Sequence, residues 1–213
     1  MVTVVTGDRE RSERARRGHP AATVVPTADA IWERPGDHEL VVIATANDSH
    51  VPLARRAIEA GLGVVVDKPL APTSAEAADL VERARSAGVR LTVFQNRRWD
   101  SDLLTLRRLI DEGALGEVHR FESRFERWRP ELAEGAWREE VPRAEGGGLL
   151  LDLGTHLVDQ ALQLFGPVAE VRGEVEHRRG GPADDDVFVA LRHESGVRSH
   201  LWASSMAAAA GPR

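Results

Sequence analysis

Short apolar runs alternate with polar, helix-forming segments through the first 95 residues, and this rhythm limits the fold more than any other feature of the chain. Apolar runs typical of strands occur near residues 2–6, 23–25, 40–45, 63–66 and 90–94, and segments typical of helices occur near 8–17, 27–32, 50–60 and 75–87. Strands that alternate with helices predict βαβ units and a parallel sheet. We therefore predict an α/β domain with a doubly wound, Rossmann-like parallel sheet over residues 1–98.

Local signals support individual elements of this domain. Asp8 and Thr27 stand where N-caps are expected, because their side chains can accept from the free backbone N–H groups of a first helical turn. The run from Leu40 to Thr45 is apolar enough for a strand in a sheet that is covered on both faces. Arg14 to Arg17 is the densest basic cluster and is interpreted as a solvated helix face.

The pattern changes after residue 98, where longer alternating strands appear. Residues 117–127 alternate between two faces, residues 149–165 form a strongly apolar helix that follows three glycines, and further strands are expected near 168–178, 187–192 and 197–204. Glu194-Ser195-Gly196 predicts a hairpin turn. We expect an α+β domain with an open antiparallel sheet over residues 99–213.

Composition excludes several classes of function. The formal charge of −6, with arginines interleaved among acidic residues, argues against a nucleic-acid-binding protein. The absence of cysteine removes disulfides, thiolate nucleophiles and cysteine-bound metals. No apolar run reaches the ~20 residues of a membrane span, and no signal peptide is recognisable, so a cytoplasmic protein is expected.

Lys68 is the only lysine among 28 lysine and arginine residues. An ammonium group is compact and can lose its proton when buried, which the guanidinium of arginine does not do. Lys68 also follows a short apolar strand and precedes Pro69, so it is expected at the carboxyl end of a parallel sheet, where ligands bind. The alternative is a loop residue that is lysine by chance.

Four polar residues of the helix at 149–165 recur at a spacing that gives them one face: Asp152, His156, Asp159 and Gln163. A carboxylate four residues before a histidine can orient the imidazole, so His156 is a candidate general base. Two alternatives stay open: an ordinary amphipathic helix, and a metal site that would recruit His193, His200 or Asp184 to Asp186. Trp128 and Trp137 are candidate wall or lid residues of a site, or parts of a packed loop.

Asp67-Lys68-Pro69 after a strand, Asn96-Arg97-Arg98-Trp99, and the run GGGLLLDLGTHLVD from Gly146 to Asp159 occur in the order in which they occur in the Gfo/Idh/MocA family, which this chain resembles. The resemblance implies a Rossmann domain that binds NAD or NADP, followed by a domain that carries the substrate and often the subunit contacts. It assigns catalytic positions to Lys68, Asp152 and His156. It assigns the cofactor side to Thr6, Thr45, Asn47, His50, Asp67, Lys68 and Gln95, and no metal.

The resemblance also implies a cis bond before Pro69 and usually a glutamate where Asp67 stands. Arg9 and Arg11, near the end of the strand that ends at Thr6, are compatible with NADP as well as with NAD, and the choice between the two stays open. No GxGxxG lies ahead of Val2 and the substrate sheet of the family normally continues further, so we expect a chain that is truncated at both ends and lacks the first βα unit.

The function that follows is an NAD(P)-dependent oxidoreductase that moves a hydride between nicotinamide and a hydroxyl-bearing carbon of a sugar, cyclitol or related polyol. We expect a homodimer or homotetramer in the full-length form, with neither nucleic acid nor membrane as a partner. The alternatives are a non-catalytic sensor or partner protein of the same fold, and an inactive fragment that binds no dinucleotide.

Overall fold

The structure of this protein, a computed structural model, describes residues 2–209, and the extreme ends of the two expected domains lie outside this range. The chain divides into two compact units, which are described separately. Unit 1 comprises residues 1–45, 49–70 and 74–93, and unit 2 comprises residues 46–48, 71–73 and 94–213. The domain boundary predicted after residue 98 stays a prediction.

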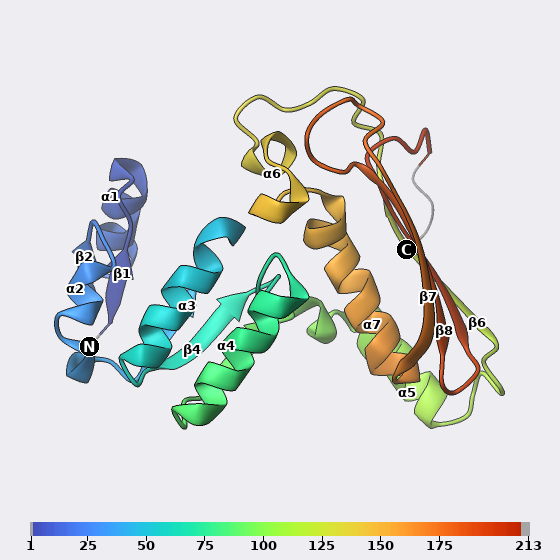
Figure 1. Cartoon of the computed structure of the whole chain (residues 1–213), viewed down its shortest axis with the longest axis horizontal. Helices are drawn as coiled ribbons and strands as arrows, with labels where there is room; N and C mark the ends of the chain where they lie inside the picture. Colours follow the sequence, from blue (N-terminus) through green and yellow to red (C-terminus); the bar gives the residue numbers. More distant parts are fainter. Residues whose placement is uncertain (1, 210–213) are drawn as a thin grey trace. The chain divides into compact units, whose positions relative to one another are not determined.

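Unit 1 is an α/β unit whose strands pair in parallel, as the sequence rhythm predicts (Figure 1). Its elements, two of which extend partly into unit 2, are β1 (Thr3–Val5), α1 (Arg9–Gly18), β2 (Thr23–Val25), α2 (Asp29–Trp32), a 3₁₀ turn (Pro35–Asp37), β3 (Leu40–Ile43), a 3₁₀ turn (Asn47–Ser49), α3 (His50–Glu59), β4 (Gly63–Asp67), α4 (Ser74–Ser86) and β5 (Leu91–Phe94). Strands β1 and β2 form one sheet, and β3, β4 and β5 form another.

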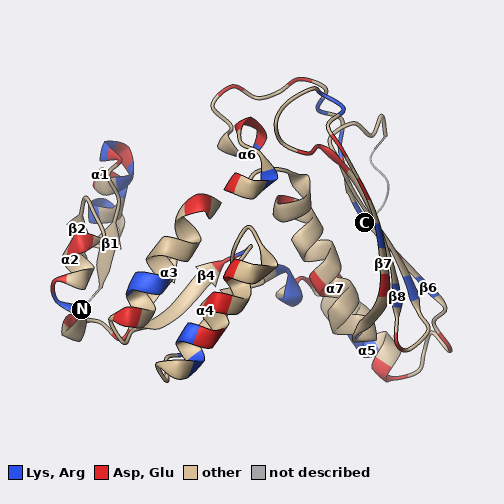
Figure 2. Cartoon of the chain, viewed as in Figure 1, with Lys and Arg blue, Asp and Glu red and all other residues tan. Residues whose placement is uncertain are grey.

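Helix α1 begins as predicted and is solvated on every side. The Asp8 carboxylate accepts from the backbone N–H of Arg11 at 2.7 Å, and no residue of α1 is buried. Acidic and basic residues are interleaved along the helix (Figure 2). Arg9 and Arg17 both form ion pairs with Glu13. The basic cluster is therefore a solvated helix face, as predicted.

Two local predictions in unit 1 were wrong. Thr27 is not the N-cap of α2, because the helix begins at Asp29 after Ala28, which makes no side-chain cap. Strand β3 is not covered on both faces: Leu40 is 53% exposed and Val42 is 65% exposed. The apolar run correctly indicated a parallel strand, but in the described chain β3 pairs with β4 alone and its alternate side chains reach solvent.

Unit 2 packs helix α7 against one face of a four-stranded sheet (Figure 1). Its elements are a 3₁₀ turn (Asn96–Trp99), α5 (Ser101–Asp111), β6 (Arg120–Glu126), α6 (Trp137–Glu140), a 3₁₀ turn (Arg143–Glu145), a π-helical turn (Leu150–Gly154), α7 (Thr155–Phe165), β7 (Val168–Glu176), β8 (Asp186–His193) and β9 (Arg198–Ser204). Leu157 and Ala161 of α7 lie in the core with Val187, Leu191 and Leu201 of the sheet.

The sheet of unit 2 is open, as expected, and its strand order is β6-β9-β8-β7. Strands β7, β8 and β9 pair antiparallel, whereas β6 pairs in parallel with β9, so the sheet is mixed. Alternation within residues 117–127 predicted a strand with two faces, and it could not reveal which distant strand would lie beside it. Within residues 2–209 no helix combines the length and apolar character needed to span a bilayer.

Candidate functional site

The carboxyl ends of β3 and β4 lie at one edge of their parallel sheet and carry two of the predicted residues, Thr45 and Lys68. Buried His50, at the start of α3, links the loops behind both strands: Nδ1 lies 2.8 Å from the Pro69 carbonyl oxygen and Nε2 lies 3.2 Å from that of Thr45. Thr45 also accepts from the Ser49 hydroxyl at 2.6 Å. His50 therefore positions both loops of this edge.

Lys68 and its neighbours have the local geometry that the resemblance implies. The Lys68–Pro69 peptide bond is cis, as expected. The Asp67 carboxylate contacts the backbone of the next residue: its Oδ1 accepts from the Lys68 N–H at 2.8 Å. At the end of β1, the Thr6 hydroxyl accepts from the Asp8 N–H at 3.3 Å.

Asn47 and Gln95 belong with unit 2. Asn47 is buried, and its amide donates to the carbonyl of Gly146 at 2.7 Å. Gln95 carries a buried side-chain oxygen, Oε1, that has no hydrogen-bond partner among the described residues. Buried acceptors are normally satisfied, so this oxygen fits the N–H group of a ligand amide.

Three glycines lead into the helix that carries the candidate base, and a Cβ on any of them would clash; on Gly146 it would lie 2.6 Å from the Cβ of Asn47. A Cβ on Gly147 would lie 1.9 Å from the Val141 carbonyl oxygen. Gly148 has a φ of +93°, and a Cβ there would lie 2.1 Å from Asp184 Oδ1. Asp184 caps the helix start, because its carboxylate accepts from the N–H of Leu150 at 2.7 Å. The sequence GGGL thus lets Asp184 approach the backbone closely enough to cap it.

Asp152 and His156 lie on a helix that opens with a π turn. The predicted helix at 149–165 is present, but residues Leu150–Gly154 are π-helical before α7 begins at Thr155. Such turns are frequent at functional sites. His156 is 4% exposed, and its ring meets the edge of Phe125 at a centroid distance of 6.5 Å.

The other two residues of the predicted polar face, Asp159 and Gln163, differ in their surroundings. Asp159 makes a bidentate ion pair with Arg98, at 2.8 and 2.5 Å. This pair ties α7 to the Asn96–Trp99 turn, and it raises the pKa of Arg98 through their hydrogen bonds. Gln163 is exposed.

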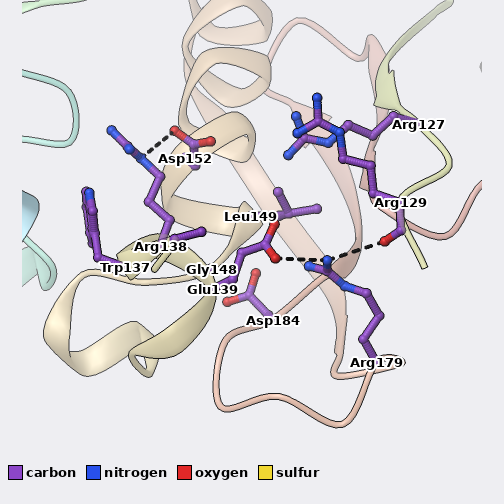
Figure 3. Close-up of a pocket in the computed structure, with 11 residues that line it drawn as sticks. Arg127, Arg129, Trp137, Arg138, Glu139, Gly148, Leu149, Asp152, Arg179 and Asp184 are labelled. Atoms are coloured by element: carbon purple, nitrogen blue, oxygen red, sulfur yellow. Dashed lines mark hydrogen bonds and ion pairs between the residues drawn. The ribbon is translucent and has the colours of Figure 1, made fainter. Parts of the chain in front are cut away.

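A cavity of about 240 Å³ lies in unit 2 beside Asp152 (Figure 3). Its charged lining residues are Arg127, Arg129, Arg138, Glu139, Asp152, Arg179 and Asp184. The predicted wall residue Trp137 also lines it, whereas Trp128 is not among its lining residues and pairs with Met206. Sequence reasoning missed the four arginines, although the i, i+2 spacing of Arg127 and Arg129 on an extended chain already predicts a shared face.

Two of the four arginines are committed to carboxylates. Arg138 Nε lies 3.4 Å from Asp152 Oδ1. The side chain of Arg179 is 3% exposed and lies 3.1 Å from Glu139 and 3.0 Å from Asp185. These contacts connect α6, the π turn and the β7–β8 loop around the cavity (Figure 3).

The residues nominated for a metal have other contacts. His193 lies between the Gly166 carbonyl and the Ser199 hydroxyl, 2.9 Å from each. Asp185 accepts from the backbone N–H groups of Arg178 and Arg179 at 2.7 and 2.9 Å. Among residues 2–209 no three histidine or acidic side chains converge as a metal site would require.

The free energy of unfolding of the Asp184→Asn variant, measured relative to that of the wild type, is expected to increase as pH rises. Burial raises the pKa of Asp184, despite the hydrogen bond from Leu150, so the folded state binds more protons than the unfolded state above the ordinary aspartate pKa. The wild type therefore loses stability as pH rises from about 4 toward neutral. Denaturant unfolding of wild type and Asp184→Asn across this range measures the difference.

Asp79→Asn is a control for which the opposite change of stability with pH is expected. Hydrogen bonds from Arg83 and then Arg55 lower the pKa of Asp79, so its contribution to stability is present at neutral pH and is lost on acidification. The Asn variant should be less stable than the wild type at neutral pH, and the difference should shrink toward acid pH. The same sign of pH dependence in both variants would contradict the Asp184 assignment.

His50→Ala is expected to lower the free energy of unfolding by about 2–4 kcal/mol, because it leaves a cavity and deprives the Pro69 carbonyl of its partner. Chemical denaturation measures this loss. His19→Ala is the control, since His19 is exposed at the end of α1 and its truncation should have little effect. Equal stability of the two variants would show that His50 does not position the sheet edge.

A parallel-sheet unit with loops at its carboxyl edge is followed in the chain by a mixed-sheet unit with a buried histidine, and open parallel sheets of this kind bind ligands at that edge. Residues 1–95 match the family described as "Oxidoreductase family, NAD-binding Rossmann fold", and residues 103–213 match the GFO/IDH/MocA C-terminal domain. The chain belongs to the Gfo/Idh/MocA family.

Two relatives and one solved structure illustrate the similarity. The chain is 43% identical over 194 residues to the uncharacterized oxidoreductase YdgJ of Escherichia coli, which covers 91% of this chain and 55% of YdgJ. It is 36% identical over 203 residues to scyllo-inositol 2-dehydrogenase (NADP(+)) IolW of Bacillus subtilis, covering 95% and 56%. An NAD-binding protein from Listeria innocua superposes with a TM-score of 0.89 at 29% identity, covering 100% of this chain and 61% of that protein. The chain thus spans little more than half the length of these relatives.

Proposed function

We propose that this protein is an NAD(P)-dependent oxidoreductase that transfers a hydride between nicotinamide and a hydroxyl-bearing carbon of a sugar, cyclitol or related polyol. The observation that carries the proposal is the position of buried His156 four residues after Asp152, which lines a polar cavity. Membership of an oxidoreductase family and similarity to an inositol dehydrogenase support it.

In this proposal the cofactor supplies the hydride acceptor or donor at its nicotinamide ring. Gln95 would accept from the nicotinamide carboxamide through Oε1, which otherwise lacks a donor among the described residues. Thr6, Thr45 and Asp67 stand at strand ends of unit 1, where a dinucleotide is held in this fold class. The buried side chains of Asn47 and His50 would act by holding the surrounding loops.

His156 is proposed to accept the proton of the substrate hydroxyl when a polyol is oxidised. Lys68 is proposed to donate a hydrogen bond to the same oxygen and to stabilise its negative charge as the proton leaves. Asp152 is proposed to favour the charged form of His156 after the transfer. In the direction of reduction, the same groups return the proton to the carbonyl oxygen.

NADPH is proposed to bind more tightly than NADH. The Asp8 carboxylate is engaged in capping α1, and the hydrogen bond from the Arg11 N–H lowers the pKa of Asp8. Arg9 and Arg11 lie exposed beside the end of β1, where they can meet the 2′-phosphate of NADP. Similarity to an NADP(+)-dependent relative supports this preference.

Titration of the 213-residue chain with NADPH and NADH, followed by nucleotide fluorescence, tests cofactor binding. We expect micromolar affinity for NADPH and weaker binding of NADH. Absence of saturation by either nucleotide would contradict the proposal for this chain. Assembly into a homodimer or homotetramer belongs to the same proposal and is measured by light scattering during size-exclusion chromatography.

A further inference from the structure

Two arginines of the cavity beside Asp152 lack carboxylate partners. Arg138 and Arg179 are ion-paired, but Arg127 and Arg129 make no ion pair among the described residues. The Nε of Arg127 is buried and has no hydrogen-bond partner among residues 2–209. A buried guanidinium nitrogen in a protein is normally hydrogen-bonded or paired with an anion. Arg127 is partly buried and Arg129 is exposed, and the positive charge of neither is neutralised by an ion pair with a carboxylate among the described residues.

The backbone fixes both side chains on one side of the chain. The N–H of Arg127 donates to the Ser204 carbonyl at 2.9 Å and that of Arg129 to the Ser205 carbonyl at 2.8 Å, so the extended strand continues past β6. Residues two apart on an extended chain point the same way. Figure 3 shows both side chains running from this strand into the same part of the cavity.

The two guanidinium groups also affect each other. Burial lowers the pKa of Arg127, and the neighbouring positive charge of Arg129 lowers it further. Repulsion of this kind makes the empty arrangement unfavourable and an anion between the two groups favourable. Planar guanidinium forks bind carboxylates and phosphates through paired hydrogen bonds.

We infer that Arg127 and Arg129 bind a carboxylate group of the substrate, which makes the substrate a polyhydroxy acid rather than a neutral polyol. The inference rests on the proposed function, and it names the substrate class of the same site. Arg138 is paired with Asp152, and Arg179 with Glu139 and Asp185, so a bound carboxylate would meet Arg127 and Arg129. The acidic residues of the lining, Glu139, Asp152 and Asp184, repel a phosphate dianion more strongly than a single carboxylate.

Asp152 lines the same cavity as the arginine pair and precedes His156 by four residues on one helix. A carboxylate held by Arg127 and Arg129 would therefore orient the polyol chain beside Asp152, one helical turn before the proposed general base. The arginines act as specificity-determining residues in this account, since they contact the acid group and not the reacting carbon. Their loss should raise KM for acids much more than it lowers kcat.

The binding test uses gluconate, sorbitol and sorbitol 6-phosphate as probes, with calorimetric titration of the wild type and of Arg127→Gln and Arg129→Gln. We expect gluconate to bind about 10- to 100-fold more tightly than sorbitol, and each variant to lose most of this difference. Arg107→Gln is the charge-matched control, because Arg107 is exposed on α5 and outside the cavity lining, and it should bind gluconate like the wild type.

Turnover of the same compounds with NADP separates this inference from the proposed function. A wild type that oxidises sorbitol as efficiently as gluconate, with no effect of either arginine variant, would overturn the carboxylate site while leaving the proposed function standing. Tighter binding of sorbitol 6-phosphate than of gluconate would also overturn it. Selective, arginine-dependent binding of gluconate without turnover of any compound would support the site and contradict the proposed function.

Discussion

Replacing His156 by alanine is expected to lower kcat by about 100- to 10,000-fold, with little change in the affinity for NADPH. His156 is 4% exposed and is the second residue of α7, after the π turn that carries Asp152, so the variant removes the proposed proton acceptor and leaves the strand ends of unit 1 intact. Lys68→Ala should also lower kcat strongly, because the substrate oxygen loses a charged hydrogen-bond donor. Steady-state kinetics and nucleotide titration, on the longest form that the gene encodes, measure both effects.

His119→Ala serves as the control for these variants. The side chain of His119 is 73% exposed just before β6, and its removal should leave kcat unchanged. His156→Gln retains a polar side chain of similar size, so a loss of kcat with an unchanged unfolding midpoint would exclude misfolding as the cause. Unchanged turnover in both the His156 and Lys68 variants would refute their assignment.

Gly148→Ala is expected to lower the free energy of unfolding by about 2–6 kcal/mol, the sum of backbone strain and overpacking. The φ of +93° disfavours any residue with a Cβ, and that atom would lie 2.1 Å from Asp184 Oδ1. Relief of the clash would move Asp184 away from the Leu150 N–H that it caps. Denaturant unfolding measures the loss, and circular dichroism at zero denaturant establishes whether the variant is folded.

Gly196→Ala separates the two contributions. Gly196 has a φ of +89°, nearly that of Gly148, but nothing lies within 4 Å of a Cβ at this position. Its substitution should therefore cost only the strain of about 1–3 kcal/mol. Equal losses in the two variants would show that the close approach of Asp184 does not limit position 148.

Local signals predicted most elements of the fold because each depends on neighbouring residues. Asp8 caps α1 three residues before the N–H that it binds, and the alternation in residues 117–127 yields β6. Thr27 misled because an N-cap works only where the chain turns into a helix at the next residue, and α2 starts later. The parallel pairing of β6 with β9 joins segments far apart in the sequence, which no local period encodes.

The sequence indicated the motif residues of the candidate site, but it did not indicate which residues surround them in the folded protein. The spacing of Asp152 and His156 indicated a shared helix, although the π turn between Leu150 and Gly154 changes its local geometry. The cavity depends on Arg138 from α6 and Arg179 from the β7–β8 loop, which only the folded chain brings together. Asp184 was considered as a metal ligand and instead caps the helix start.

Transfer of deuterium from substrate to nicotinamide is the direct test of the proposed oxidoreductase activity. The protein, in the longest form that its gene encodes, is incubated with NADP and with polyols and polyhydroxy acids deuterated at their hydroxyl-bearing carbons, and the nucleotide is analysed by mass spectrometry. We expect deuterium on the reduced nicotinamide with at least one compound, and its loss in the His156→Ala variant. Tight binding of NADP without transfer from any of these compounds would indicate a non-catalytic sensor and would refute the proposed oxidoreductase activity.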